Sequence, residues 1–205
     1  MNPLILEYLQ FTVSKTFSLH SLAFASLRQT VSKAGVKEQY YGLTDDESMH
    51  LLWVIEWPKE INPTEFKGDS GNFRQNVNAL DVASKPTSWL VPFRFAEEVR
   101  PALTAPISEF ALIYLKETSK PESMSETLHK TFTDCYYAKG FTGGNWGIAS
   151  NSNDRVCVYV LGWESRAAHS EYAKSDLFAL EINKLLPHYA PGSKGIFSKL
   201  TQECS

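Results

Sequence analysis

The segment Val156–Tyr172, VCVYVLGWESRAAHSEY, holds the side chains whose types and spacing best suit chemistry. His169 and Tyr172 stand three residues apart, which places them on one face of a helix. An imidazole ordinarily titrates near neutral pH, so His169 is the first candidate for proton transfer. Tyr172 can donate a hydrogen bond to a ligand oxygen. The structural alternatives are a histidine that bonds a backbone carbonyl and a tyrosine that only packs in the core.

Aromatic side chains near this segment can line an apolar pocket. Trp163 can stack on a flat aromatic ligand, although a place in the core is the alternative. Asn145-Trp146, which follows Gly143-Gly144, puts an amide beside an indole, as in a polar group within an apolar pocket; a glycine-rich turn followed by a packed tryptophan is equally consistent. The lining candidates are Phe132, Tyr136, Trp146 and Trp163 in this half of the chain, and Tyr41, Trp53 and Trp57 in the other.

Several other kinds of site are disfavoured because their sequence patterns are missing. The five histidines form no HxH or HExxH spacing, so we expect no metal ion. No GxSxG pattern is present, which disfavours a hydrolase of that type. Cys157 alternates with valines in an apolar strand and is interpreted as a small core residue rather than a nucleophile.

The composition is that of a globular protein without a nucleic-acid or membrane partner. The chain has 205 residues, 43% of them hydrophobic and 21% charged, with a net charge of −3 and no basic stripe. No apolar run approaches the roughly 20 residues of a membrane-spanning helix, and Glu7 comes too early for a signal peptide. Three cysteines at unrelated spacings favour reduced thiols and a cytoplasmic location.

The residues around these candidates predict two similar halves. In the first half we expect strands at Leu4–Val13, Lys37–Leu43, His50–Trp57 and Trp89–Phe95. We expect one helix at Ser18–Lys33, with Ser18 as N-cap, and a second, poorer helix that opens at Pro63-Thr64-Glu65, is broken by Gly68 and Gly71, and resumes around Phe73–Leu80. Pro92 restricts the last strand to an edge of the sheet, because proline cannot donate a backbone hydrogen bond. A linker marked by two prolines is expected at Glu97–Pro106.

The second half repeats this order. Its expected strands are Ser108–Leu115, Asn145–Ser150, Val156–Trp163 and Gly195–Leu200, and its expected helices are Ser123–Lys139 and Arg166–Leu186, the latter capped by Ser165. The first strands of the two halves align as EYLQFTV and EFALIYL. Each half is thus a β-α-β-β-α-β, ferredoxin-like repeat, and the two repeats are predicted to span residues 1–100 and 107–205.

The expected strand order in each sheet is 4-1-3-2, which puts the strand that contains Pro92 at an edge. Helices cover one face of such a sheet. The central strands are apolar on both faces, since Trp53 and Ile55 alternate with Leu52 and Val54, so the second face also needs cover. We therefore predict an α+β protein whose two tandem repeats pack sheet to sheet as an intramolecular α+β barrel.

The double repeat and the segment VLGWESRAAHSEYAKSDLF resemble the antibiotic biosynthesis monooxygenase-like proteins of the dimeric α+β barrel superfamily. Typical members have a third strand that ends in Trp-Glu, followed by a helix with a short polar start and a histidine. Residues 107–200 match this pattern. In residues 1–106, Trp57-Pro58 replaces Trp-Glu and no histidine aligns with His169, so the first repeat looks degenerate. The whole chain is most similar to two-repeat, mostly fungal members.

The resemblance identifies the fold better than the reaction. It implies a cofactor-independent monooxygenase or related cyclase of polyketide-like secondary metabolism. Such an enzyme binds a hydrophobic aromatic substrate, and molecular oxygen, in a cleft that we expect in the second repeat. His169 would be the base, and Asn145 or Tyr172 would stabilise an enolate-like oxygen. The residues leave open a non-catalytic binding or structural protein, a haem-degrading enzyme, and a homodimer of chains.

Overall fold

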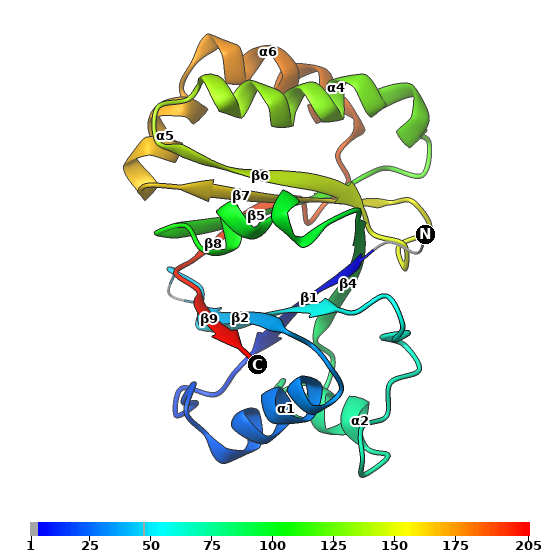
Figure 1. The fold of residues 1–205 in the computed structure, drawn as a ribbon. Coiled ribbons are helices and arrows are strands. Elements are labelled where there is room, and N and C mark those ends of the chain that lie inside the picture. The colour runs from blue at the N-terminus through cyan, green and yellow to red at the C-terminus, as the bar shows by residue number, and fades with distance from the viewer. Residues whose placement is uncertain (1–3, 47) are drawn as a thin grey trace. The chain divides into compact units, whose positions relative to one another are not determined.

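The computed structural model describes residues 4–46 and 48–205, and its contacts divide the chain into two compact units. The first unit is Met1–Ala96 with Ser198–Ser205, and the second unit is Glu97–Phe197. Each contains one antiparallel sheet whose longer helices lie on one of its faces (Figure 1). In the second unit a short helix, residues 100–103, lies against the opposite face, where a Cβ atom at Gly162 would be 2.8 Å from the Cα atom of Ala102. Among the described residues, no helix is both long enough and apolar enough to cross a membrane.

The first unit is a ferredoxin-like repeat with one added strand. Its elements are β1 (Leu4–Thr12), α1 (Leu22–Lys33), β2 (Glu38–Leu43), β3 (His50–Trp57), α2 (Phe73–Asn78) and β4 (Thr87–Phe93). The strand order β4-β1-β3-β2-β9 confirms the predicted 4-1-3-2 order and the edge position of Pro92. The added strand β9 (Thr201–Cys204) pairs with β2 and escapes prediction because its sequence, TQEC, is almost entirely polar.

Alternation along the strands sorts the side chains between the two faces of the first sheet. Trp53, Ile55 and Trp57 lie on the face that the helices cover, where they join one buried cluster with Phe24 of α1 and Phe73 of α2. The three aromatic rings of Trp53, Phe24 and Phe73 meet edge to face, at centroid distances of 5.3 and 6.4 Å. This face of the first unit is therefore filled by aromatic side chains.

The second unit repeats the topology. Its elements are α3 (Arg100–Leu103), β5 (Ile107–Tyr114), α4 (Pro121–Thr133), β6 (Phe141–Ile148), β7 (Val156–Trp163), α5 (Arg166–Ala173), α6 (Asp176–Leu185) and β8 (Lys194–Ser198), with a 3-10 turn, η2 (Asp134–Tyr137), after α4. Its strand order β6-β7-β5-β8 is again 4-1-3-2 when counted within the repeat. Two tandem ferredoxin-like repeats are therefore confirmed, and the packing of one sheet against the other stays a prediction.

Two predictions for segments that precede the second sheet, a helix start and a linker, differ from the structure. α1 starts at Leu22, because Ser18 belongs to a turn before the helix, in which its carbonyl accepts the N–H of Ser21. The expected linker Glu97–Pro106 contains the short helix α3. Pro101 lies in the first turn of that helix, where its missing N–H leaves no helical hydrogen bond unmade.

The predicted helices of the second unit also end earlier than expected. The helix expected at Arg166–Leu186 is divided into α5 and α6, because Ser175 caps a new helix by accepting the N–H of Phe178 at 3.2 Å. The helix expected at Ser123–Lys139 tightens into η2 after Thr133. A 3-10 turn has three residues per turn, so Tyr136 no longer follows the inward stripe of α4 and is 62% exposed.

β6 is longer than predicted, because Gly143 and Gly144 lie within the strand rather than in a turn. The register between β6 and β7 shifts at a bulge between Phe141 and Gly143. Gly144 has a φ of +148°, and a Cβ atom there would lie 2.0 Å from the carbonyl oxygen of Val160. Glycine is required for so close an approach of two strands. The bulge decides which of the following side chains face the helices.

Candidate active site

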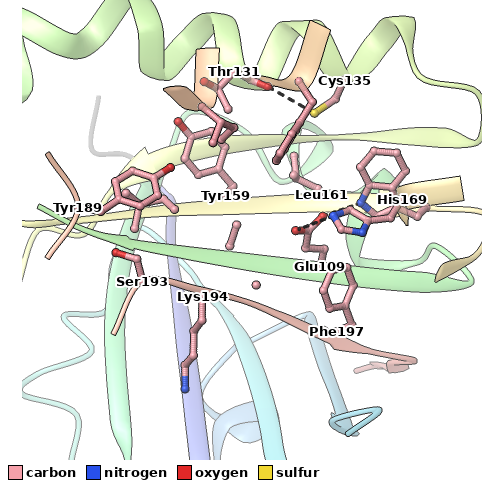
Figure 2. A pocket seen from close by; sticks show the side chains of 16 residues that line it. Glu109, Thr131, Cys135, Tyr159, Leu161, His169, Tyr189, Ser193, Lys194 and Phe197 are labelled. Carbon is pink, nitrogen blue, oxygen red and sulfur yellow. Dashed lines mark hydrogen bonds and ion pairs between the residues drawn. The ribbon is translucent and has the colours of Figure 1, made fainter. Parts of the chain in front are cut away.

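A cavity of about 330 Å³ lies within the second unit, between its sheet and its helices (Figure 2). Strands β5, β7 and β8 line one side, and α4, η2, α5 and α6 line the other. Its volume falls in the range of about 300–1,000 Å³ that is typical of ligand pockets. The lining is mostly aromatic and aliphatic, with a few polar side chains; those that bear on its chemistry are Glu109, Tyr159, Trp163, His169, Gly195 and Phe197.

Glu109 of β5 is the buried charge of this cavity. Its side chain is only 8% exposed, and a carboxylate so deeply buried needs partners. The indole N–H of Trp163 donates to its Oε2 at 2.8 Å. Its Oε1 lies 3.5 Å from Nε2 of His169, as the dashed line in Figure 2 marks. A carboxylate and an imidazole are thus held side by side at the wall of an apolar cavity.

His169 is positioned by α5 and by two aromatic rings. The helix begins at Ser165, whose hydroxyl accepts the N–H of Ala168 at 3.1 Å, and this confirms the predicted N-cap. The imidazole packs edge to face against Trp163 and Phe197, at centroid distances of 5.2 and 4.7 Å. This packing holds the ring beside Glu109 and leaves it in the lining of the cavity.

The first unit contains the same glutamate–tryptophan pair. Glu7 stands on β1 where Glu109 stands on β5, since Ile5 pairs with Trp57 as Ile107 pairs with Trp163. The indole N–H of Trp57 donates to Oε2 of Glu7 at 2.7 Å, which matches the 2.8 Å distance in the second unit. The two repeats therefore share a structural pair that can be compared directly.

The surroundings of the two pairs differ. In the first unit, Arg74 donates to both carboxylate oxygens of Glu7, at 2.6 and 3.1 Å, and Ser88 donates to Oε1 at 3.1 Å. The rings of Phe66 and Phe73 lie 4.9 and 6.2 Å from Trp57. A hollow of about 310 Å³ in this unit is lined by α1, by α2 and by residues on both sides of α2, and not by the sheet. The pair of the first unit is therefore neutralised and covered, whereas that of the second unit faces a cavity.

Two of the three predicted reacting residues lie outside the cavity lining. Tyr172 is buried behind Trp163 and Phe178, at centroid distances of 5.8 and 5.5 Å, and burial raises the pKa of its phenol. Asn145 pairs with Val160, so it lies on the sheet face opposite the cavity, and its Oδ1 accepts the N–H of Trp146 at 2.8 Å. His169 alone of the three lines the cavity.

The structure places one of the predicted aromatic lining residues at the cavity and the others elsewhere. Trp163 lines the cavity, whereas Trp146 stacks on Tyr159 at 5.6 Å and donates its N–H to Nδ1 of His129. Phe132 packs against Tyr136 and Phe141 at centroid distances of 5.6 and 6.5 Å, and neither Phe132 nor Tyr136 belongs to the cavity lining. Tyr41, Trp53 and Trp57 lie in the core of the first unit.

Glu109 is the residue that reasoning from the sequence missed. A signal was present, because the aligned strands EYLQFTV and EFALIYL both begin with a glutamate. A carboxylate that recurs at one position of an otherwise apolar strand indicates a buried partner. Among the residues that the structure describes, no group of three or more His, Cys, Asp and Glu side chains is arranged to hold a metal ion.

Cys135 and Cys157 of the second unit are buried thiols, whereas Cys204 is exposed. Burial raises the pKa of Cys135 and of Cys157 to about 12. The thiolate is the reactive form, so at pH 8 we expect iodoacetamide to modify Cys204 at least about 100-fold faster than the two buried thiols. Peptide mass spectrometry over time measures the three rates. In denaturant the three rates should converge, and equal rates in the native protein would contradict the assigned burial.

Comparisons with known proteins find a likeness in structure and none in sequence. No family model matches the chain. No curated protein matches it either. Among solved structures, a proposed monooxygenase of Fusobacterium nucleatum is 11% identical, with a TM-score of 0.67 over 100% of this chain and 95% of that chain. An anthrone oxidase-like protein is 11% identical, with a TM-score of 0.68 over 99% and 94%.

A second proposed monooxygenase, from Lactobacillus acidophilus, is 12% identical, with a TM-score of 0.64 over 98% of this chain and 96% of that chain. The chain has the fold of these two-repeat, monooxygenase-like proteins. The resemblance read from VLGWESRAAHSEYAKSDLF is therefore confirmed for the fold along the full chain. Identities this low show the fold alone, so any reaction has to be argued from the cavity.

Proposed function

We propose that the second unit is an oxygenase-type enzyme that works without a bound cofactor on a hydrophobic aromatic molecule of polyketide-like secondary metabolism, in the cytoplasm. The observation that carries this proposal is the Glu109–His169 pair, which lines an apolar cavity; among the described residues, no arginine or lysine forms an ion pair with that carboxylate. The first unit has the same glutamate, but Arg74 neutralises it, so that unit serves as scaffold.

The proposed chemistry starts with a proton. His169 takes an acidic C–H proton from the substrate, and the imidazolium that forms is stabilised by the carboxylate of Glu109 at 3.5 Å. The substrate carbanion adds to O₂ and forms a carbon–oxygen bond, which gives a peroxide. The peroxide takes up the proton and then loses water, which breaks the O–O bond and leaves a carbonyl. One oxygen atom ends in the product and the other in water.

The lining of the cavity supports this chemistry. Trp163, Phe178, Tyr189 and Phe197 offer aromatic surfaces to a flat ligand, and an apolar cavity keeps water from protonating the carbanion. One solved structure with this fold is named anthrone oxidase-like. An anthrone is an aromatic ketone with an acidic CH₂ group, so it is the probe of choice for this cavity.

Oxygen uptake with anthrone tests the proposed function. We expect the full chain to consume one O₂ per anthrone, faster than buffer alone, because the base and the dry cavity lower the barrier to the carbanion. Under ¹⁸O₂ the product should carry one labelled oxygen atom. A chelator should leave the rate unchanged. Uptake no faster than in buffer, across anthrone and related hydroxylated polycycles, would reject the proposed reaction.

A further inference from the structure

We propose that Glu109 selects ligands that offer a neutral hydrogen-bond donor, such as a phenolic or enolic hydroxyl, and rejects ligands that carry an anionic group at that position. The proposal rests on the proposed function in one respect, which is that the ligand occupies the cavity of the second unit. It adds the chemical group by which this cavity recognises its ligand.

Glu109 can accept more hydrogen bonds than the protein donates to it. A carboxylate offers about four acceptor positions. Trp163 uses one of them, on Oε2, while Nε2 of His169 stands 3.5 Å from Oε1, beyond the usual range for an N–H···O bond. Among the described residues, none donates a hydrogen bond to Oε1. A carboxylate in this condition, only 8% exposed and at the wall of the cavity, favours a ligand that can donate to Oε1.

In the first unit, the protein itself supplies the hydrogen-bond donors to the corresponding glutamate. Glu7 accepts from Trp57, twice from Arg74 and once from Ser88, so protein groups supply four donors. Glu109 accepts from Trp163, but among the described residues no arginine or serine donates to it as Arg74 and Ser88 donate to Glu7. The donors that are missing in the second unit are those that a ligand has to supply.

Gly195 of β8 keeps the approach to Glu109 open. A Cβ atom at this position would lie 3.2 Å from Oε1 of Glu109 and 3.3 Å from the ring of Phe197. A side chain there would stand against the carboxylate and take up space that a ligand hydroxyl needs. The backbone φ of Gly195 lies outside the left-handed region, so alanine is tolerated by the backbone itself.

The charged side chains that line the cavity decide whether a neutral or an anionic ligand group is preferred. Lys194 lines the cavity, but Figure 2 shows its side chain pointing away from Glu109. A ligand carboxylate beside Glu109 would place two like charges together in an apolar cavity, where their repulsion is poorly screened. A neutral hydroxyl donates to Oε1 and brings no charge with it.

Matched naphthalene ligands test the proposal under anaerobic conditions at pH 7, by calorimetry on the full chain. We expect 2-naphthol to bind at least about tenfold more tightly than 2-naphthoate, because the carboxylate repels Glu109. We also expect 2-naphthol to bind at least about threefold more tightly than 2-methylnaphthalene, which has no hydrogen-bond donor. In Glu109→Gln the preference over naphthoate should shrink to about threefold or less. The control Glu171→Gln removes the same charge from an exposed position of α5 and should keep the preference.

Gly195→Ala provides a second variant, which keeps the carboxylate of Glu109 and its charge. It should bring the affinity for 2-naphthol down to that for 2-methylnaphthalene. Three results would each overturn the proposal. The first is equal binding of naphthol and naphthoate, and the second is an unchanged preference in Glu109→Gln. The third is tighter binding of 2-naphthylmethylammonium than of naphthol. No turnover occurs in these measurements. If the protein prefers naphthol over naphthoate but takes up no oxygen with anthrone, only the proposed reaction is rejected. If it takes up oxygen but binds the two ligands equally, only the proposed ligand class is rejected.

Discussion

Replacing His169 with alanine is expected to lower the rate of anthrone oxidation by at least about tenfold, because a positioned general base contributes on the order of 100-fold or more. The imidazole lies between Trp163 and Phe197 and beside Glu109, so its loss removes the group that would accept the substrate proton. Initial rates of oxygen uptake at saturating anthrone measure the effect. His129→Ala is the matched control, since His129 is exposed on α4 and lies outside the cavity lining.

A double-mutant cycle separates proton transfer from simple packing. Glu109→Gln alone should also slow the reaction, because the imidazolium loses its carboxylate partner. In the His169→Ala background, the same change should cost much less, since the two residues act as one unit. Unchanged turnover in His169→Ala would remove this residue from the mechanism. Additive effects of the two changes would show that Glu109 and His169 act separately.

Arg74→Met is expected to destabilise the first unit by about 2–4 kcal/mol. Removing one partner of a buried ion pair costs about 3–5 kcal/mol, and we take a lower range because the Arg74 side chain is 30% exposed to water. Glu7 would remain as a buried carboxylate, 1% exposed, with the donors Trp57 and Ser88. Amide hydrogen exchange in β1 and β3 measures this unit by itself, which matters because two units need not unfold together.

The controls for this prediction come from the same chain. Lys174→Met breaks an exposed pair with Glu171 and should change stability by about 0.5 kcal/mol or less. The double change Glu7→Gln with Arg74→Met should recover at least half of the lost stability, since no unpaired charge remains buried. If Arg74→Met costs no more than Lys174→Met, Arg74 does not neutralise Glu7 as described.

Local patterns determined most of the fold of this protein. The strands His50–Trp57 and Val156–Trp163 are found with their predicted limits, because a short β-branched and aromatic run has few other stable conformations. Pro92 determined an edge strand through its missing N–H, and Ser165 determined a helix start through its hydroxyl. Each of these signals acts within a few residues, so it can be read without the rest of the chain.

The tertiary structure decided which residues share the candidate site. The side of the sheet taken by Asn145 depends on the bulge at Gly143, and the place of Tyr172 depends on how α5 lies against Trp163. Glu109 meets His169 across 60 residues of sequence, through the pairing of β5 with β7 and the packing of α5. Such meetings depend on register and on the packing of distant elements, which hydrophobic periodicity does not specify.

The contrast between the two repeats was likewise decided in three dimensions. The sequence by itself determined that both repeats carry a glutamate in the first strand and a tryptophan at the end of the third. Only the folded chain shows that Arg74 reaches Glu7 across 67 residues, whereas the corresponding carboxylate, Glu109, faces a cavity. The reason is physical: the state of a buried charge depends on the groups that surround it in space, and those come from remote parts of the chain.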